Sequence, residues 1–299
     1  MTGTVSVAVP RKGRPLEAAL ERFAAVAGAD AEALADSVAS TLRYEKAVTK
    51  GRQTADDGVY ERLADYSDPA GGGPEYTLVR DDRKGHPRRV VFDSARLDVA
   101  GTDVRLVGRE EPFRALRTHE FALGFDSADL VLEEVVPLDP EGVADLADVN
   151  ARIDPRDTDV RVTTGLGDTV RHTLMARPET LPAGADLDRE FVAGYEGPLC
   201  ISPRYERLVE AVLGTGALDG VEFVYPEEGV EEEAAIAETG LGVYLTVTGG
   251  TAREHGLVLG ADLFPSETVL LENEAETTAA TDALGRALGR GVETAIRAE

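Results

Sequence analysis

The chain has 299 residues, 42% of them hydrophobic, and a formal net charge of −25 from 56 acidic and 31 basic residues. This length allows two lobes, and the apolar content suffices for packed cores. No apolar run reaches the roughly 18 residues of a membrane helix, and the acidic excess argues against non-specific nucleic-acid binding, which needs clustered lysine and arginine.

In the N-terminal half, apolar runs bounded by turn residues predict strands, and apolar residues at a spacing of three to four predict helices. The predicted strands are residues 5–9, 76–80, 89–92, 104–107 and 121–125. The predicted helices are residues 15–27, 30–42, 111–118 and 128–133, with a loop at 67–74 and a turn at 81–86 that joins a hairpin.

In the C-terminal half, a helix-like segment extends from about residue 141 to 149. The strands predicted there are residues 160–163, 199–202, 221–225, 242–246 and 269–272, and the helices are 204–213, 227–239 and 277–298. Strands that alternate with helices indicate an α/β fold with parallel, doubly wound sheets, which bind ligands at the carboxyl ends of their strands.

The excess of acidic residues and the scarcity of lysine indicate the salt concentration at which the chain works. Only four basic residues are lysines, namely Lys12, Lys46, Lys50 and Lys84. At about 1 M salt the Debye length is near 3 Å, so self-repulsion across an acidic surface is largely screened. We therefore expect a halophilic protein, and a cytoplasmic one because the first residues do not form a charged and then apolar signal segment.

Cysteine and histidine give no sign of a metal site. The single cysteine, Cys200, excludes an internal disulfide and a cysteine-based zinc site. It lies in an apolar segment and is expected to be a buried small hydrophobe. The four histidines show no ligand spacing, so no metal bound by the protein itself is expected; they are His86, His119, His172 and His255.

The most informative segment is the glycine pair in Thr248-Gly-Gly-Thr251, which lies between a predicted strand and a helix. Glycines let a backbone approach a ligand closely, and the first N–H groups of a helix are unpaired and partly positive. Such a turn suits a phosphate group. It is neither a Walker loop nor a dinucleotide-binding loop, because the sequences that define these loops are missing.

Four blocks in order along the chain resemble the ATP phosphoribosyltransferase family, which catalyses the first step of histidine biosynthesis. Residues 226–257 resemble its signature region, with matches at Gly229-Val-Glu231, at Thr248-Gly-Gly-Thr251 and at His255-Gly-Leu257. Residues 7–14 resemble its opening strand and Pro-Lys-Gly-Arg turn. Residues 105–112 and 121–133 resemble its Arg-Asp-x-Pro and Asp-Leu-Gly stretches, and residues 262–273 resemble the strand after the loop.

The resemblance implies two lobes of the type II periplasmic-binding-protein kind with a substrate cleft between them. Lobe I would span residues 1–137, with an extra region at about 28–95, and lobe II would span residues 138–258 and carry the phosphate loop. Residues 259–299 would return to lobe I and end in a helix, without the regulatory domain of the family's long form.

The resemblance also implies the reaction, in which phosphoribosyl is transferred from phosphoribosyl pyrophosphate to N1 of ATP and pyrophosphate is released. Mg²⁺ would come bound to the substrate. Thr248, Gly249, Gly250 and Thr251 would bind the 5-phosphate. Further substrate contacts are expected from Lys12, Arg14, Arg109 and Glu231. No residue is assigned to catalysis, because positioning and charge stabilisation dominate such a displacement.

Two departures from the family keep alternatives open. Tyr244 and Gly240 stand at positions that are usually acidic in the family, and the first of these acids meets ribose hydroxyls there. The chain could therefore be a non-catalytic two-lobed anion-binding module or partner subunit derived from the same fold. Transfer to a base other than adenine, with another nucleotide as substrate, is a third reading, and the sequence leaves open whether the chain forms a homo-oligomer.

Overall fold

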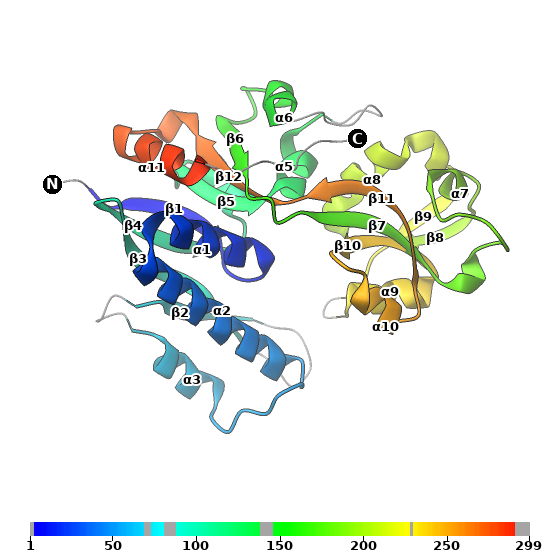
Figure 1. Cartoon of the computed structure of the whole chain (residues 1–299). Coiled ribbons are helices and arrows are strands. Elements are labelled where there is room, and N and C mark those ends of the chain that lie inside the picture. The colour runs from blue at the N-terminus through cyan, green and yellow to red at the C-terminus, as the bar shows by residue number, and fades with distance from the viewer. Residues whose placement is uncertain (1–2, 69–72, 81–87, 138–145, 228–229, 291–299) are drawn as a thin grey trace. The chain divides into compact units, whose positions relative to one another are not determined.

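The structure is a computed structural model that describes residues 3–68, 73–80, 88–137, 146–227 and 230–290. The chain divides into two compact units (Figure 1). Among the described residues, unit 1 contains those up to Ser127, Pro155–Gly167 and those from Thr268 onward, and unit 2 contains those within Ala128–Asp154 and Asp168–Glu267.

Unit 1 is built on a seven-stranded sheet in the order β2-β3-β4-β1-β5-β12-β6. Its strands are β1 (Val5–Pro10), β2 (Glu75–Arg80), β3 (Arg88–Val99), β4 (Thr102–Arg109), β5 (Leu123–Ser127), β6 (Val160–Gly165) and β12 (Thr268–Asn273). Strand β1 pairs in parallel with β4 and β5, whereas β2, β3, β6 and β12 pair antiparallel with their neighbours. The sheet is therefore mixed.

Helices cover this sheet and complete the core of unit 1. They are α1 (Arg14–Ala27), α2 (Ala29–Thr49), α3 (Val59–Tyr66), α4 (Pro112–Arg117), η4 (Glu274–Glu276) and α11 (Ala279–Gly289). Leu16, Leu20 and Phe23 form the buried face of α1 at helical spacing, and Phe23 meets Phe125 of β5 edge to face at 5.8 Å between ring centroids. This apolar stripe fixes α1 over the end of β1.

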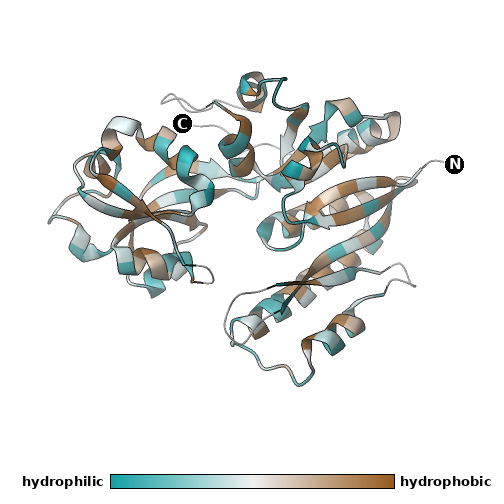
Figure 2. Cartoon of the chain, turned by 180° about the vertical axis from the view of Figure 1, so that it is seen from behind, coloured by the Kyte–Doolittle hydropathy of each residue, from teal (hydrophilic) through white to brown (hydrophobic). Residues whose placement is uncertain are grey.

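Unit 2 is built on a five-stranded sheet in the order β11-β7-β10-β8-β9. Its strands are β7 (Val170–Ala176), β8 (Gly197–Cys200), β9 (Val221–Val224), β10 (Leu241–Thr246) and β11 (Val258–Ser266). Strands β10, β8 and β9 run parallel, so their carboxyl ends share one edge, while β7 pairs antiparallel with β10 and β11. Figure 2 shows that apolar residues concentrate on the strands of both sheets.

The helices of unit 2 are mostly short. They are α5 (Ala128–Val135), α6 (Leu146–Arg152), η1 (Pro178–Thr180), α7 (Arg189–Ala193), η2 (Pro203–Tyr205), α8 (Glu206–Leu213), η3 (Thr215–Leu218), α9 (Glu232–Thr239) and α10 (Gly250–Glu254). Within the described residues, no helix is long and apolar enough to cross a membrane.

A reciprocal clamp joins α5 to α8. The guanidinium of Arg207 donates to the carbonyl oxygens of Leu132 at 2.6 Å and of Val136 at 3.2 Å, and also to the carbonyl of Glu133. In return, the Glu133 carboxylate accepts the backbone N–H groups of Arg207 and Leu208 at 3.2 and 2.7 Å. Each side chain thus satisfies backbone groups that a helix end would leave unpaired.

Residues 28–95, whose place the sequence leaves open, belong to unit 1. Helix α2 packs against α1 and β3, and β2 and β3 extend the sheet at its edge (Figure 1). Glu45 of α2 ties α3 down, because both of its carboxylate oxygens accept from Arg62, at 2.7 and 2.9 Å, and Oε1 also accepts the Tyr66 hydroxyl at 3.0 Å.

The predicted two-lobed α/β class is confirmed, with corrections. Both sheets are mixed rather than parallel. Strands β7 and β11 are absent from the sequence prediction over most of their length. The last helix ends at Gly289, and the predicted turn at 81–86, the start of the helix at 141–149 and residues 291–298 lie wholly or partly outside the described residues.

The predicted lobe boundaries also differ from the observed ones. The chain leaves unit 1 after Ser127 rather than near residue 137, and it returns at Thr268 rather than at 259. Between these points it re-enters unit 1 for Pro155–Gly167. The reason is strand pairing, because β6 lies beside β12 in the sheet of unit 1 although some hundred residues of chain separate them.

Candidate functional site

The glycine loop follows β10 and has a backbone that only glycine fits. Gly249 has φ +68° and ψ +19°, in the left-handed region. A Cβ atom built there would lie 2.2 Å from Cδ1 of Leu259 and 3.2 Å from Nη1 of Arg253. Arg253, which follows the turn in the sequence, also holds it in place, since its Nη2 donates to the carbonyl of Thr248 at 2.7 Å. The loop is thus held in one shape by sterics and by a charged hydrogen bond.

A cavity of about 380 Å³ opens at this loop. It is lined by residues 245–252, by Glu233 of α9 and by Glu254 of α10. Thr248 and Thr251 are exposed. Helix α10 has only five residues, so an anion here would be bound by individual N–H groups and threonine hydroxyls rather than by a long helix dipole.

Three consecutive glutamates, Glu231 to Glu233, stand at the start of α9, and Glu233 lines the cavity. Nε2 of His255 lies 3.6 Å from Oε2 of Glu231. Burial, with the charges of Glu232 and Glu233, raises the pKa of Tyr244. Burial, together with Glu232 and Glu231, also raises the pKa of Glu233, against the opposing effect of His255.

The predicted cations lie in unit 1, at the carboxyl ends of β1 and β4. Pro10 and Arg109, the last residues of these strands, are paired in register. Lys12 Nζ lies 2.9 Å from Glu110 Oε1, and Arg109 Nη2 lies 3.3 Å from Glu120 Oε2. The guanidinium of Arg109 also covers the Phe121 ring at 4.9 Å from its centroid. Each of these two cations is therefore already balanced by an acid.

Arg14 is the first residue of α1, directly after Gly13, whose φ of +80° forms the turn out of β1. The structure thus sorts the sequence candidates into two groups. Lys12, Arg14 and Arg109 share one strand edge of unit 1, and the loop residues 248–251 and Glu231 share one edge of unit 2.

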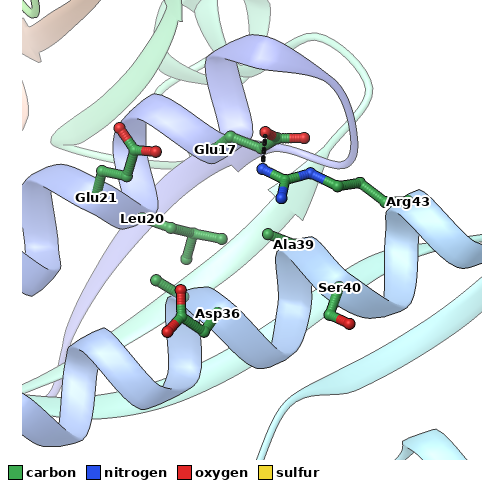
Figure 3. A pocket seen from close by; sticks show the side chains of 8 residues that line it. Glu17, Leu20, Glu21, Asp36, Ala39, Ser40 and Arg43 are labelled. Carbon is green, nitrogen blue, oxygen red and sulfur yellow. Dashed lines mark hydrogen bonds and ion pairs between the residues drawn. The ribbon is translucent and has the colours of Figure 1, made fainter.

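Two further cavities have no cluster of donors. One, of about 340 Å³, lies between α1 and α2, where Glu17 accepts from Arg43 at 2.8 Å and Glu21 and Asp36 face the same space (Figure 3). The other, of about 550 Å³, runs along α9 and is lined partly by Cys200 and Tyr225. Cys200 is buried, as predicted, and burial raises the pKa of its thiol, which keeps it protonated and unreactive.

A buried polar cluster in unit 2 has no counterpart in the sequence prediction. His172 of β7 is 1% exposed, stacks on Phe264 at 4.0 Å between centroids and meets Tyr205 edge-on at 4.6 Å. Its Nε2 lies 3.6 Å from Oδ2 of Asp129, which is also 1% exposed. The cluster lies in the interior of unit 2, where His172 is paired in register with Leu245 of β10.

The sequence prediction also missed Glu232, Glu233 and Glu254 as neighbours of the loop. The run of acids at 227–233 is typical of a solvated helix face, and nothing local distinguishes one glutamate from the next. Among the described residues, no group of three or more His, Cys, Asp or Glu side chains could hold a metal ion.

Comparison with known proteins gives a family match over nearly the whole chain. The model of the family described as Halobacterial ATP phosphoribosyltransferase matches residues 1–298. No curated protein matches the sequence significantly.

Three solved structures illustrate the likeness in fold. An ATP phosphoribosyl transferase (HisG:HisZ) complex from Thermotoga maritima is 14% identical, with a TM-score of 0.44, 95% of this chain and 96% of that chain covered. The regulatory domain of MetR, a LysR family regulator from N. meningitidis, is 12% identical, with a TM-score of 0.37 and coverage of 62% and 79%. The arginine-bound form of truncated ArgBP from T. maritima is 10% identical, with a TM-score of 0.36 and coverage of 63% and 76%. At these scores the structural likenesses carry no argument about function.

Proposed function

Because the chain belongs to the halobacterial ATP phosphoribosyltransferase family, we propose that it transfers the phosphoribosyl group of phosphoribosyl pyrophosphate to N1 of ATP. In this reaction the lone pair of N1 forms a bond to the anomeric carbon. The bond from that carbon to the pyrophosphate oxygen breaks, and its electron pair leaves with pyrophosphate. No covalent bond to the protein is needed, so positioning and charge stabilisation supply the catalysis.

The observation that carries the proposal is the loop 248–251, within a family match that spans residues 1–298. The loop presents backbone N–H groups and two exposed threonine hydroxyls around a cavity, which are the donors that a phosphate monoester needs. We assign the 5-phosphate to this loop. Glu231 is assigned to the substrate through its position at the start of α9, beside His255.

We assign Lys12, Arg14 and Arg109 to the remaining anionic groups of the substrates. They lie at the carboxyl ends of two parallel strands, where α/β sheets bind ligands. Since the described residues offer no metal cluster, Mg²⁺ is expected to arrive as part of the pyrophosphate substrate and to neutralise its charge. ATP and phosphoribosyl pyrophosphate are cytoplasmic metabolites, so we propose that the chain works in the cytoplasm.

The test is pyrophosphate release in multimolar KCl with Mg²⁺, phosphoribosyl pyrophosphate and ATP. We expect release that depends on ATP and that falls at least about tenfold in Thr251→Ala, because a hydrogen bond to a charged group is lost. Thr215→Ala, an exposed threonine of η3 in the same unit, is the matched control and should keep full activity. Absence of ATP-dependent release in the unchanged protein would refute the proposal.

A second function is favoured by Tyr244 and Gly240, which replace acidic residues of the family. It is a non-catalytic module or partner subunit that binds phosphorylated ligands. The same assay separates the two functions, because such a module would be stabilised against heat by phosphoribosyl pyrophosphate but would release no pyrophosphate.

A further inference from the structure

An acid and a base face each other in the interior of unit 2. Nε2 of His172 lies 3.6 Å from Oδ2 of Asp129, and each of the two residues is only 1% exposed. Asp129 is the second residue of α5, and His172 lies on β7, which is flanked by β11 and β10. The pair therefore joins a helix to an inner strand of the sheet, at a place that bulk solvent does not reach.

Two aromatic rings pack against the imidazole of His172. Phe264 of β11, its partner in register, stacks on it with 4.0 Å between ring centroids and 24° between ring planes. Tyr205 of η2 meets it edge-on at 4.6 Å. Burial, with the charge of Asp129, raises the pKa of Tyr205, so the hydroxyl of this tyrosine stays uncharged. The face of an aromatic ring attracts a cation, so the stacking on Phe264 favours the protonated imidazole.

The elements around the pair add acid rather than base to its surroundings. On β10, His172 is paired in register with the apolar Leu245. A second acid, Glu267, is 1% exposed and follows β11, and its backbone carbonyl accepts the N–H of Ala128 at the start of α5 at 2.9 Å. The other charged residues of these elements have partners of their own or lie at the surface: Arg171 with Asp262, Glu133 with Arg207, Glu206 with Tyr225, and Arg204.

The glutamates of α9 lie beyond the other face of β7. Side chains alternate between the two faces along a strand. Met175, three residues along β7 from His172, packs with Ala235 and Ile236 of α9. The face of β7 that carries His172 is therefore not the face that α9 covers, and Asp129 is the carboxylate that is paired with the imidazole.

One protonation state leaves this buried pair without net charge. A lone carboxylate or a lone imidazolium is costly in a protein interior, so neither the loss nor the gain of a proton by the pair is favoured. The single proton belongs on His172, because an ordinary imidazole, with a pKa of about 6.5, binds it more tightly than an ordinary aspartate, with a pKa of about 3.9. We propose that His172 carries this proton in the folded chain at neutral pH and that the His172–Asp129 pair is a pH-sensitive lock of unit 2, which alkaline pH opens.

The direction of the pH effect follows from the two states of the chain. The unfolded chain loses the histidine proton from about pH 6.5 upward, whereas the folded chain holds it to a higher pH. The stability that the pair supplies is therefore complete below about pH 6.5 and is lost as the pH rises through the folded value. Because His172 is paired with Leu245, which lines the loop cavity, the lock supports the strand that carries the loop. The inference does not depend on the proposed function.

Nitrogen NMR of the histidine rings, recorded on the full chain in multimolar KCl, tests the protonation directly. In the unchanged protein, the His172 signal is identified by through-space contacts of its ring with the rings of Phe264 and Tyr205. We expect it to report a protonated ring up to at least about pH 8. In Asp129→Asn the same ring should be neutral above about pH 6.5, because burial then acts without a countercharge.

Denaturant unfolding at fixed KCl measures the effect on stability. In the unchanged protein we expect the pair to lower the folding equilibrium constant at least about tenfold between pH 6.5 and 8. The double variant Asp129→Asn/His172→Gln replaces both ionisable groups by amides of similar size and should lack this part of the fall. His255→Gln is the matched control, because His255 and Glu231 have the same 3.6 Å separation but are partly exposed. Solvent screens such a pair, so this variant should keep the fall.

A neutral His172 ring at pH 7 in the folded, unchanged protein would overturn the proposal, and this result needs no variant. The proposal would also fail if the stability of the double variant fell with pH as steeply as that of the unchanged protein. Failure of the proposed function has a different signature. In that case the ring stays protonated and the pH dependence is lost in the double variant, but the unchanged protein shows no ATP-dependent pyrophosphate release.

Discussion

Two tyrosine–glutamate pairs in this molecule have similar chemistry and opposite surroundings. In unit 1, Glu45 is 3% exposed and accepts from Tyr66 and from two nitrogens of Arg62. In unit 2, the charge of Glu232 contributes to the raised pKa of Tyr244, and the neighbours of Glu232 in sequence are two more glutamates.

The difference lies in charge balance. Around Glu45 one guanidinium matches one carboxylate and every oxygen has a donor, so the network is closed and ties α3 to α2. Near Tyr244, three glutamates follow one another at the start of α9, and Nε2 of His255 lies 3.6 Å from Oε2 of Glu231. A closed network indicates a structural role, whereas an excess of carboxylates next to a cavity is a feature that functional sites often share.

Breaking the closed network should have the largest effect. Arg62→Ala leaves the carboxylate of Glu45 buried without its countercharge, and we expect a loss of about 3–5 kcal/mol in the free energy of unfolding. Arg43→Ala is the control, because the pair of Arg43 with Glu17 is largely exposed and should cost about 1 kcal/mol or less. Denaturant unfolding at fixed KCl measures both, and equal costs would contradict the comparison.

At the loop 248–251, we expect the shape of the backbone, rather than a network of charges, to decide how a substitution affects activity. Gly249→Ala places a side chain at positive φ and within 2.2 Å of Leu259, so the loop must change shape. We expect kcat/KM for phosphoribosyl pyrophosphate to fall about 100-fold, which corresponds to about 2.7 kcal/mol. Gly256→Ala has a similar φ of +72° but open space around the added atom, so it isolates the cost of backbone strain. A similar loss of activity in both variants would refute the steric argument.

The closed network should also be visible in alkaline unfolding. Burial and the bond to Glu45 raise the pKa of Tyr66 from 10.0 to about 12. Above pH 10 the unfolded chain loses this proton first, so the free energy of unfolding falls between pH 10 and 12. Allowing for solvent screening, we expect Tyr66 to account for about 1 kcal/mol of that fall. Tyr66→Phe should remove this part, and an identical pH profile for both proteins would speak against it.

The smallest effect should come from Glu233. Its raised pKa means that the folded chain holds the proton more tightly than the unfolded chain. Stability therefore falls as the pH rises from the ordinary value of 4.5 through the raised one. At pH 7, Glu233→Gln should be at least as stable as the unchanged protein, by about 0.5 kcal/mol or less because solvent screens a partly exposed group. Thermal unfolding between pH 4 and 8 measures this, and a clear destabilisation at pH 7 would show that Glu233 supports the fold instead.

Much of the local structure follows from the sequence. The buried stripe of α1 and the strands β1, β4 and β10 are predicted close to their observed bounds, because their apolar patterns are regular. Strand β7 is missed because His172 and Thr173, polar residues of a strand flanked by β11 and β10, are both buried. Strand β11 is missed because irregular pairing on either side of Asp262 breaks the alternation that marks a strand.

The candidate site, too, can be predicted only in part from the sequence. The sequence points to Thr248-Gly-Gly-Thr251 because left-handed turns and close approach to a ligand need glycine. It also identifies Lys12, Arg14 and Arg109, but it cannot show that Lys12 and Arg109 are each paired with an acid. The partner acids, Glu110 and Glu120, are brought to these cations by the fold. The spacing of residues along the chain does not predict such ion pairs.

By itself the sequence determined the α/β class, the family resemblance and the glycine loop, since each depends on residues that are near one another in the chain. Only the tertiary structure decided that β6 belongs to the sheet of unit 1 and that Glu233, rather than Glu231 or Glu232, lines the loop cavity. Both depend on contacts between segments far apart in sequence or on the rotation of α9 against β10. A helix turns by about 100° per residue, so three identical neighbours receive three different environments as soon as the helix packs.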